Sequence, residues 1–124
     1  MQKPKKSHMM GRDEAKRDEM PWGRLVWMAS ASQGNSESMT VGRCEILPGR
    51  VNYHHLHPNC DEILHLLEGE ILHHVGGENP VAMKPGDTIN IPAGLPHYAE
   101  NTGPGMATML VVFSSANRET QILS

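Results

Sequence analysis

The sequence predicts an all-β protein that folds as one antiparallel sandwich or barrel. Two observations support this: short apolar runs recur at even spacing, and turn signals rich in Gly and Pro separate them. The stretches between the runs show no helical period. At 124 residues, the chain has the length of a single domain. The predicted strands lie within residues 25–28, 39–47, 62–67, 71–75, 88–91 and 106–113.

The turns between these strands are marked by residues with special backbone preferences. Pro85-Gly86 suits a type II turn, because Pro sets φ at the second position and Gly supplies a positive φ at the third. The full set of turn signals is Gly34-Asn35, Pro48-Gly49, Glu68-Gly69, Gly76-Gly77, Pro85-Gly86, Ala93-Gly94 and Gly103-Pro104-Gly105.

The N-terminal segment has a different composition from the rest of the chain. Residues 1–20 are rich in Lys, Arg, Asp, Glu and Met, and residues 12–20 have the composition of one or two helical turns without an apolar stripe to bury. We therefore expect residues 1–21 to form a flexible or partner-docked arm, and residues 22–124 to form the β-barrel domain.

Composition excludes several classes of function. The formal net charge of −3 provides no basic field for nucleic acid, and the few aromatic residues do not make a base-stacking platform. There is no run of 18 apolar residues to cross a membrane and no apolar core of a signal peptide, so we expect a cytoplasmic protein. In that compartment Cys44 and Cys60 are expected to be free thiols, with Cys44 on the buried face of its strand.

Four side chains suited to metal binding occur in one ordered pattern. It reads Gly49-x5-His55-x-His57-x4-Glu62-x6-Gly69, followed by Gly86-x5-Pro92-x-Gly94-x2-His97-x3-Asn101. Histidines two apart on a strand point to the same face. If three antiparallel strands lie side by side, His55, His57, Glu62 and His97 can converge on one ion. Three imidazoles and a carboxylate are typical of a mononuclear transition-metal site.

The two halves of this pattern resemble the two sequence motifs of the cupin superfamily. The 16 residues between Gly69 and Gly86 match the short linker of small microbial cupins, and the resemblance extends over about residues 22–115. It implies a jelly-roll barrel, an antiparallel double-stranded β-helix, with a metal inside. It also implies His55, His57, Glu62 and His97 as the ligands, and structural roles for Asn101 and the glycines.

Tyr53 is the candidate for acid–base chemistry beside these ligands. Strand alternation directs Tyr53 into the same cavity as His55, whereas a bulge would place Asn52 there instead. The alternative for Tyr53 is a rim position with a satisfied hydroxyl. Arg24, on the first predicted strand, can pair with a substrate carboxylate or lie on the surface.

The remaining candidate residues have structural interpretations. His54 and His65 are expected on the faces opposite the ligands, and one of His73 and His74 must face outward because they are adjacent on a strand. For this pair we expect solvent exposure or adventitious metal rather than chemistry. Cys60 is expected to be a loop thiol. Arg43 and Glu45 alternate with Cys44 and Ile46 along one predicted strand, so we expect Arg43 and Glu45 at outward or interface positions.

The ligand set leaves open coordination positions on one divalent ion, so it permits chelation of a small oxygenated substrate. Uses that recur in cupins with this ligand set imply a quercetinase-like dioxygenase acting on a carbonyl, enol or carboxylate compound. The alternatives are a metal-dependent isomerase or lyase and a non-enzymatic sensor that binds a small molecule. The metal can be Fe, Mn, Ni, Co, Cu or Zn. Resemblance to small cupins also implies a homodimer formed through a sheet face and exchanged N-terminal strands.

Overall fold

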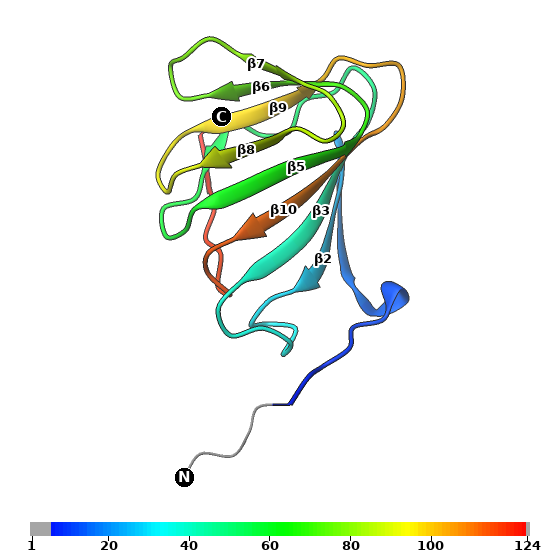
Figure 1. Cartoon of the computed structure of the whole chain (residues 1–124), viewed down its shortest axis with the longest axis vertical. Coiled ribbons are helices and arrows are strands. Elements are labelled where there is room, and N and C mark those ends of the chain that lie inside the picture. The colour runs from blue at the N-terminus through cyan, green and yellow to red at the C-terminus, as the bar shows by residue number, and fades with distance from the viewer. Residues whose placement is uncertain (1–5, 124) are drawn as a thin grey trace.

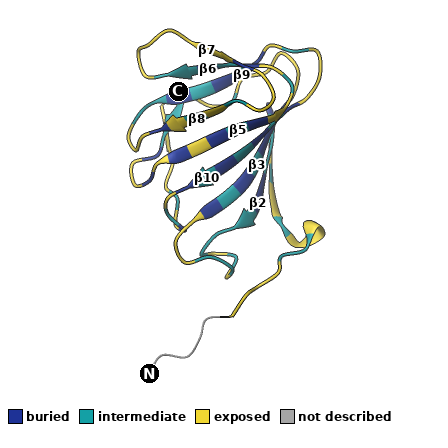
Figure 2. Ribbon diagram, viewed as in Figure 1, coloured by how far each residue is buried: buried dark blue, intermediate teal, exposed yellow. Residues whose placement is uncertain are grey.

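Alternating burial along the strands gives two antiparallel sheets that pack face to face (Figure 1). The structure, a computed structural model, describes residues 6–123. Along β10, every second side chain is buried, beginning at Ala107 and ending at Phe113. Figure 2 shows this two-residue period as alternating bands on the central strands. The all-β class expected from the sequence is confirmed.

The larger sheet has the strand order β1-β2-β3-β10-β5-β8, and the smaller sheet has the order β11-β4-β9-β6-β7. The strands are β1 (Lys16–Met20), β2 (Gly23–Ala29), β3 (Thr40–Ile46), β4 (His55–Leu56), β5 (Glu62–Glu68), β6 (Ile71–Val75), β7 (Val81–Met83), β8 (Thr88–Ile91), β9 (His97–Asn101), β10 (Ala107–Phe113) and β11 (Gln121–Ile122). All six apolar runs form strands, whereas β1, β7 and β11 were not anticipated.

The charged segment before Trp22 differs from the expected arm. Only Arg12–Glu14 make a turn of 3-10 helix, and Lys16–Met20 form β1. β1 pairs with β2 along its whole length, from Lys16 opposite Trp27 to Met20 opposite Gly23. The pairing supplies backbone partners that local composition does not reveal. Residues 1–5 of the expected arm lie outside the described residues.

The core lies between the two sheets and contains both aliphatic and sulfur side chains. Ile46, Leu66, Ile71, Ile91 and Met109 are almost completely buried, and each contributes about 1.5–3 kcal/mol by burial. Both cysteines are free and buried: Cys44 lies on the buried face of β3, as expected, and Cys60 lies in the loop before β5, as expected, with its side chain turned into the core. Burial raises the pKa of the Cys44 thiol and keeps it protonated. Among the described residues, no helix has the length and apolar character needed to cross a membrane.

Two of the motif residues with expected structural roles fix the connections near the core. At the Pro85-Gly86 turn, Asp87 N donates to Lys84 O at 3.0 Å and Gly86 has φ of 98°, as a type II turn requires. Asn101 ties the two sheets together because its Nδ2 donates to Ile46 O of β3 and to Gly105 O, both at 2.8 Å.

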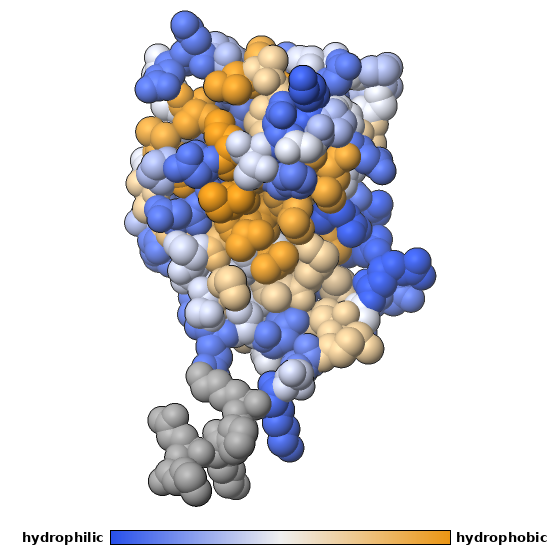
Figure 3. Space-filling model, in the orientation of Figure 1, coloured by the Kyte–Doolittle hydropathy of each residue, from blue (hydrophilic) through white to orange (hydrophobic). Residues whose placement is uncertain are grey.

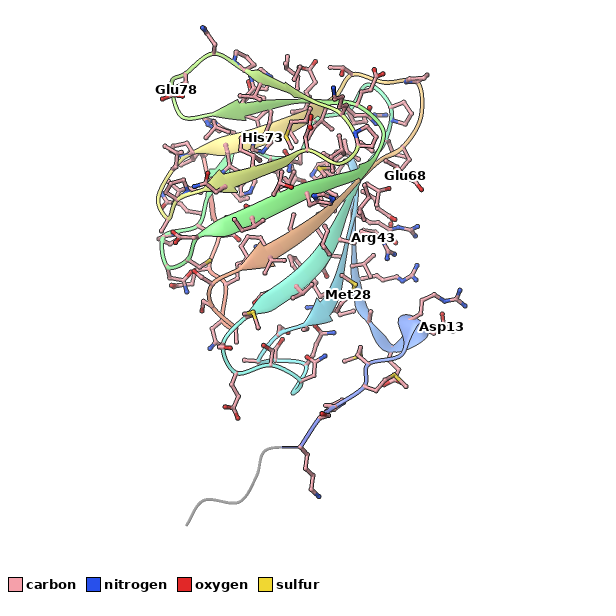
Figure 4. The ribbon with its side chains drawn as sticks, in the orientation of Figure 1. Asp13, Met28, Arg43, Glu68, His73 and Glu78 are labelled. Atoms are coloured by element: carbon pink, nitrogen blue, oxygen red, sulfur yellow. The ribbon has the colours of Figure 1, made fainter. Side chains whose placement is uncertain are left out.

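The outer face of the larger sheet buries one carboxylate that we expected at an outward or interface position. Glu45 points outward, as the alternation indicates, but Arg24 of β2 and Arg43 of its own strand cover it. It is 8% exposed. Burial alone would raise the pKa of Glu45, but the bonds from the two guanidinium groups outweigh burial and lower it. Arg24 is therefore bound to Glu45 on the outer face, away from the cavity described below. Its neighbour on this face, Arg43, is labelled in Figure 4.

Candidate metal centre

Four predicted ligands meet inside the barrel. His55 lies on β4, His57 follows that strand, Glu62 begins β5 and His97 begins β9. Their ligand atoms all lie within 4.8 Å of one another, a group that could hold one metal ion. His57, Glu62 and His97 are buried, and His55 is half-buried.

The strands carrying these residues are not three neighbours in one sheet, which corrects the expected arrangement. His55 and His97 are paired on adjacent strands of the smaller sheet, whereas Glu62 belongs to the larger sheet. The carboxylate therefore reaches the imidazoles across the barrel interior. Period-two alternation shows that a side chain faces inward, but it does not show from which sheet.

Each of the three imidazoles is oriented through Nδ1 by a backbone carbonyl. His55 Nδ1 bonds to Tyr53 O, and His97 Nδ1 lies 2.9 Å from Leu95 O. His57 Nδ1 lies 2.9 Å from Glu119 O. A carbonyl can only accept, so each Nδ1 carries the proton and each neutral ring presents its Nε2 lone pair. This is the arrangement by which proteins orient histidine ligands of metals.

The Nε2 atoms of His57 and His97 lie close to the same oxygen of the Glu62 carboxylate. Glu62 Oε1 lies 3.0 Å from His97 Nε2 and 3.4 Å from His57 Nε2. His57 Nε2 is buried without a hydrogen-bond partner among the described residues. In the neutral tautomers, lone pairs would face a carboxylate with no proton between them. A cation at the centre removes this repulsion, so the donor set fits a transition-metal ion.

Electrostatics keep the His55 imidazole neutral and the Glu62 carboxylate charged. Burial, reinforced by His97, lowers the pKa of His55 to about 4. Burial would raise the pKa of Glu62, but hydrogen bonds and positive charge from His57 and His97, present when their Nε2 atoms carry protons, outweigh burial and lower the pKa to about 2. A metal ion would take the place of these protons and likewise keep the carboxylate ionised.

The metal group lies in a cavity of about 360 Å³. Its walls are mainly apolar side chains of the larger sheet and of the turn between β1 and β2: Met20, Trp22, Leu25, Trp27, Leu64, Val111 and Phe113. Tyr53 and Asn52 both line it. Asn52 Oδ1 accepts from Ala99 N at 2.8 Å, so its amide oxygen is already used. Tyr53 is 40% exposed and packs edge-on against Trp22, which is a rim position with access to the cavity.

Two cavity residues were missed by sequence analysis. His73 is 1% exposed, its Nδ1 has no partner among the described residues, and its ring lies 5.9 Å from that of His97. It belongs to β6 and is labelled in Figure 4. Its spacing of two from buried Ile71 was the available signal. Arg118 also lines the cavity, and no local pattern indicated it.

The other histidines lie outside the metal group. His74 stacks on Tyr98 at 4.3 Å between ring centroids, and His54 approaches the same ring edge-on. His65 Nδ1 lies 2.7 Å from Thr88 Oγ1. The structural interpretations of His54, His65 and His74 agree with these contacts.

A C-terminal strap, defined as residues 117–123, covers one side of the site. Its strand β11 pairs with β4, beside His55. Asn59 holds the strap from the loop between β4 and β5: its Nδ2 donates to Asn117 O at 2.8 Å, and its Oδ1 accepts from Glu119 N at 2.9 Å. The carbonyl that orients His57 is thereby held in place.

Comparison with known proteins agrees with this architecture. The family model described as "Cupin domain" matches residues 42–113, which is more than half of the chain. The chain belongs to the cupin family. Its cupin barrel superposes on the formate complex of Lactobacillus farciminis oxalate decarboxylase with a TM-score of 0.83, covering 90% of this chain and 34% of that one at 23% identity.

Several similar cupins are named as germin-like proteins or oxalate enzymes. A germin-like protein of Morus alba is 33% identical over 93 residues, covering 72% of this chain and 44% of the relative. An oxalate oxidase of Triticum aestivum is 33% identical over 90 residues, covering 67% of this chain and 40% of the relative. A structure of oxalate oxidase with the substrate analogue glycolate has a TM-score of 0.73 and 27% identity, covering 80% of this chain and 54% of that one. The chain spans less than half the length of the two curated relatives.

Proposed function

We propose that this cupin is a metal-dependent enzyme acting on a small oxygenated substrate that bears a carboxylate. One divalent transition-metal ion would be held by His55, His57, Glu62 and His97. The observation that carries the proposal is the convergence of three Nδ1-anchored imidazoles and one carboxylate oxygen within 4.8 Å in a mostly apolar cavity. Fe, Mn, Ni, Co, Cu and Zn all accept this donor set.

When bound, such an ion supplies Lewis-acid polarisation of a substrate oxygen and, if it is redox-active, dioxygen chemistry. The protein's own residues would orient the substrate and exclude water. The apolar walls formed by Leu64, Val111 and Phe113 lower the local dielectric around the carboxylate of Glu62. At the rim, the Tyr53 hydroxyl is the proposed proton donor or acceptor for a bound substrate.

The reaction class is proposed from the relatives. Their names include oxalate oxidase and oxalate decarboxylase, and one is bound to glycolate, so a carboxylate substrate has more support than a flavonol. A dioxygenase, quercetinase-like in its use of the metal, is the first candidate, and an isomerase or lyase is the second. The non-enzymatic alternative is a sensor whose cavity holds a small molecule. A cytoplasmic location is part of the proposal, supported by the two free cysteines.

The test is metal analysis of the protein purified without a polyhistidine tag, together with oxygen uptake on candidate carboxylates. We expect about one transition-metal ion per chain, and we expect His97→Ala to lose it while retaining the β-sheet circular dichroism spectrum. His65→Ala, outside the site, should keep the metal. Unchanged metal content in His97→Ala would overturn the assignment. Oxygen uptake supports the dioxygenase, whereas turnover without uptake supports the isomerase or lyase; a metal-loaded protein that binds but never converts these acids supports the sensor.

A further inference from the structure

The cavity contains a cation that the metal group does not use. Arg118, on the C-terminal strap, lines the cavity together with Thr120 and Ile122 of the same segment. Its guanidinium carbon lies 4.3 Å from the centre of the Trp27 ring and 5.3 Å from the centre of the Phe113 ring. Trp27 comes from β2 and Phe113 from β10, so the larger sheet supports the planar group from beneath.

The position of this guanidinium is well defined. Cation–π contact with two rings restricts its plane, and its Nη1 donates to Thr120 Oγ1. A guanidinium has five N–H donors, and this is the one hydrogen bond that it makes to the described residues. The remaining donors are available to a ligand, with their direction already set by the rings.

Arg118 has no counter-ion among the described residues. The acidic groups whose charges reach it are Glu62 and Asp18, with the Cys60 thiol as a third when it is ionised. Glu62 lies against the imidazoles of His57 and His97 and makes no ion pair with Arg118. Asp18 accepts from Trp27 Nε1 at 3.0 Å and lies 4.0 Å from Lys16 Nζ. Burial lowers the pKa of Arg118, which reflects the cost of holding this charge among apolar groups. An incoming anion would offset that cost.

Phe113 relates the cation to the metal group. The centre of its ring lies 4.8 Å from the His57 ring and 5.3 Å from the Arg118 guanidinium carbon. A ligand along this wall would therefore meet the metal group, then an apolar surface, then a cation. The cavity volume of about 360 Å³ greatly exceeds that of a two-carbon acid and falls in the range of sites that enclose larger organic ligands.

We propose that Arg118 is the carboxylate anchor of this cavity and selects an organic acid with an apolar body, whose other, oxygenated end lies at His55, His57, Glu62 and His97. The second half of this statement rests on the proposed function, and the first half does not. Arginine is suited to the role because its two parallel N–H groups match the two oxygens of a carboxylate. The expected ligand is therefore larger and more apolar than oxalate.

The experiment compares an acid with its uncharged analogue on metal-free protein. The protein is stripped with EDTA and dialysed, so that no ion can hold the acid. Binding of 3-phenylpropanoate and of 3-phenylpropanamide is then measured by calorimetry and by ligand-observed NMR. We expect the acid to bind the wild type at least about tenfold more tightly than the amide, because a hydrogen bond between a guanidinium and a carboxylate is stronger than one to a neutral amide.

The variant Arg118→Gln should lose this preference, so that acid and amide bind with similar affinity. The matched control Arg50→Gln removes an exposed arginine outside the cavity and should bind as the wild type does. Equal binding of acid and amide by the wild type overturns the proposal, whichever variant folds. Retention of the acid preference in Arg118→Gln also overturns it.

Metal stoichiometry, measured on the same preparations, separates this inference from the proposed function. An acid preference that depends on Arg118, in a protein that binds no transition metal, would support the anchor and contradict the metal-dependent enzyme. One bound metal ion per chain, with no acid preference in the stripped protein, would support the metal centre and contradict the anchor.

Discussion

At the scale of single residues, the metal centre depends on protonation states that the fold imposes. The carbonyls of Tyr53, Leu95 and Glu119 fix the protons on the outer nitrogens of three histidines. Burial then opposes a second proton on the His55 ring, while Glu62 stays ionised. A site for a cation is thus prepared before any cation arrives, and protons compete with the ion for the same atoms.

The first prediction concerns pH and follows from these groups. The pKa of His55 in the folded protein, about 4, lies below its ordinary value of 6.5, so the unfolded chain takes up the proton first as pH falls. The contribution of His55 to the free energy of unfolding of the metal-free protein is therefore fully present above about pH 6.5. It decreases as the pH falls toward 4, by up to about 3 kcal/mol. Glu62, with its pKa lowered to about 2, contributes a further loss below about pH 4.5.

Urea denaturation from pH 8 to pH 3.5, with and without metal, measures this dependence. The metal-loaded protein should lose stability more steeply over the same window, because protonation also releases the ion. His54→Gln removes a histidine outside the site and should leave the profile unchanged. A free energy of unfolding that stays flat between pH 7 and pH 4 in the metal-free protein would contradict the buried, neutral state of His55.

At the scale of elements, the short strand β4 and the strap organise the site together. β4 consists of His55–Leu56, and it lies between β9 and β11. Two residues of strand provide little stability alone, so the hydrogen bonds of Asn59 to the strap carry much of the local order. They hold Glu119 O against the His57 ring and keep Arg118 over Trp27.

A second prediction tests this connection through Asn59→Ala. Loss of both side-chain bonds should free the strap, weaken the orientation of His57 and lower metal affinity by about tenfold, the lower end for residues that orient metal ligands. Competition with a fluorescent chelator measures the affinity. Asn90→Ala, on the exposed face of β8, is the matched control and should bind metal as the wild type does. Equal affinities for the two variants would show that the strap does not support the ligand.

At the scale of the whole molecule, the outer face of the larger sheet is the notable surface. Ile63 and Leu67 of β5 are 44% and 45% exposed, and the neighbouring outward residues Val41, Leu110 and Val112 are half-buried. Figure 3 shows hydrophobic side chains gathered in the middle of the molecule, where β5 and β10 pass in Figure 1. Contiguous apolar surface of this kind marks interfaces.

We therefore propose that two copies of the chain pair through this face. The strand β1 pairs with β2 of its own chain, so the face itself, rather than strand exchange, is the surface offered. We predict a dimer mass by light scattering at micromolar concentration and a monomer mass for Ile63→Glu. Val81→Glu, exposed on β7 of the opposite sheet, should remain dimeric. A monomer mass for the wild type would contradict the proposal.

The sequence by itself determined the class of fold, six strands and the set of candidate ligands. These features can be recognised along the chain. A period of two marks each strand, and Gly and Pro mark each turn. The spacing of the motif residues identifies His55, His57, Glu62 and His97 as candidate ligands. The position of Cys44 was predictable for the same reason. For the strands, the turns and Cys44 the information lies in a few neighbouring residues, and for the ligands it lies in the two motifs at residues 49–69 and 86–101.

Only the tertiary structure decided which strands meet. It placed Glu62 on the sheet opposite the histidines, made an edge strand of Lys16–Met20, and covered Glu45 with two arginines. It also brought Arg118 into the cavity from a segment with no regular pattern. Of the pair His73 and His74, for which solvent exposure or adventitious metal was expected, it buried His73. The physical reason is that alternation specifies which face a side chain occupies, whereas strand pairing and packing between distant segments specify what that face meets.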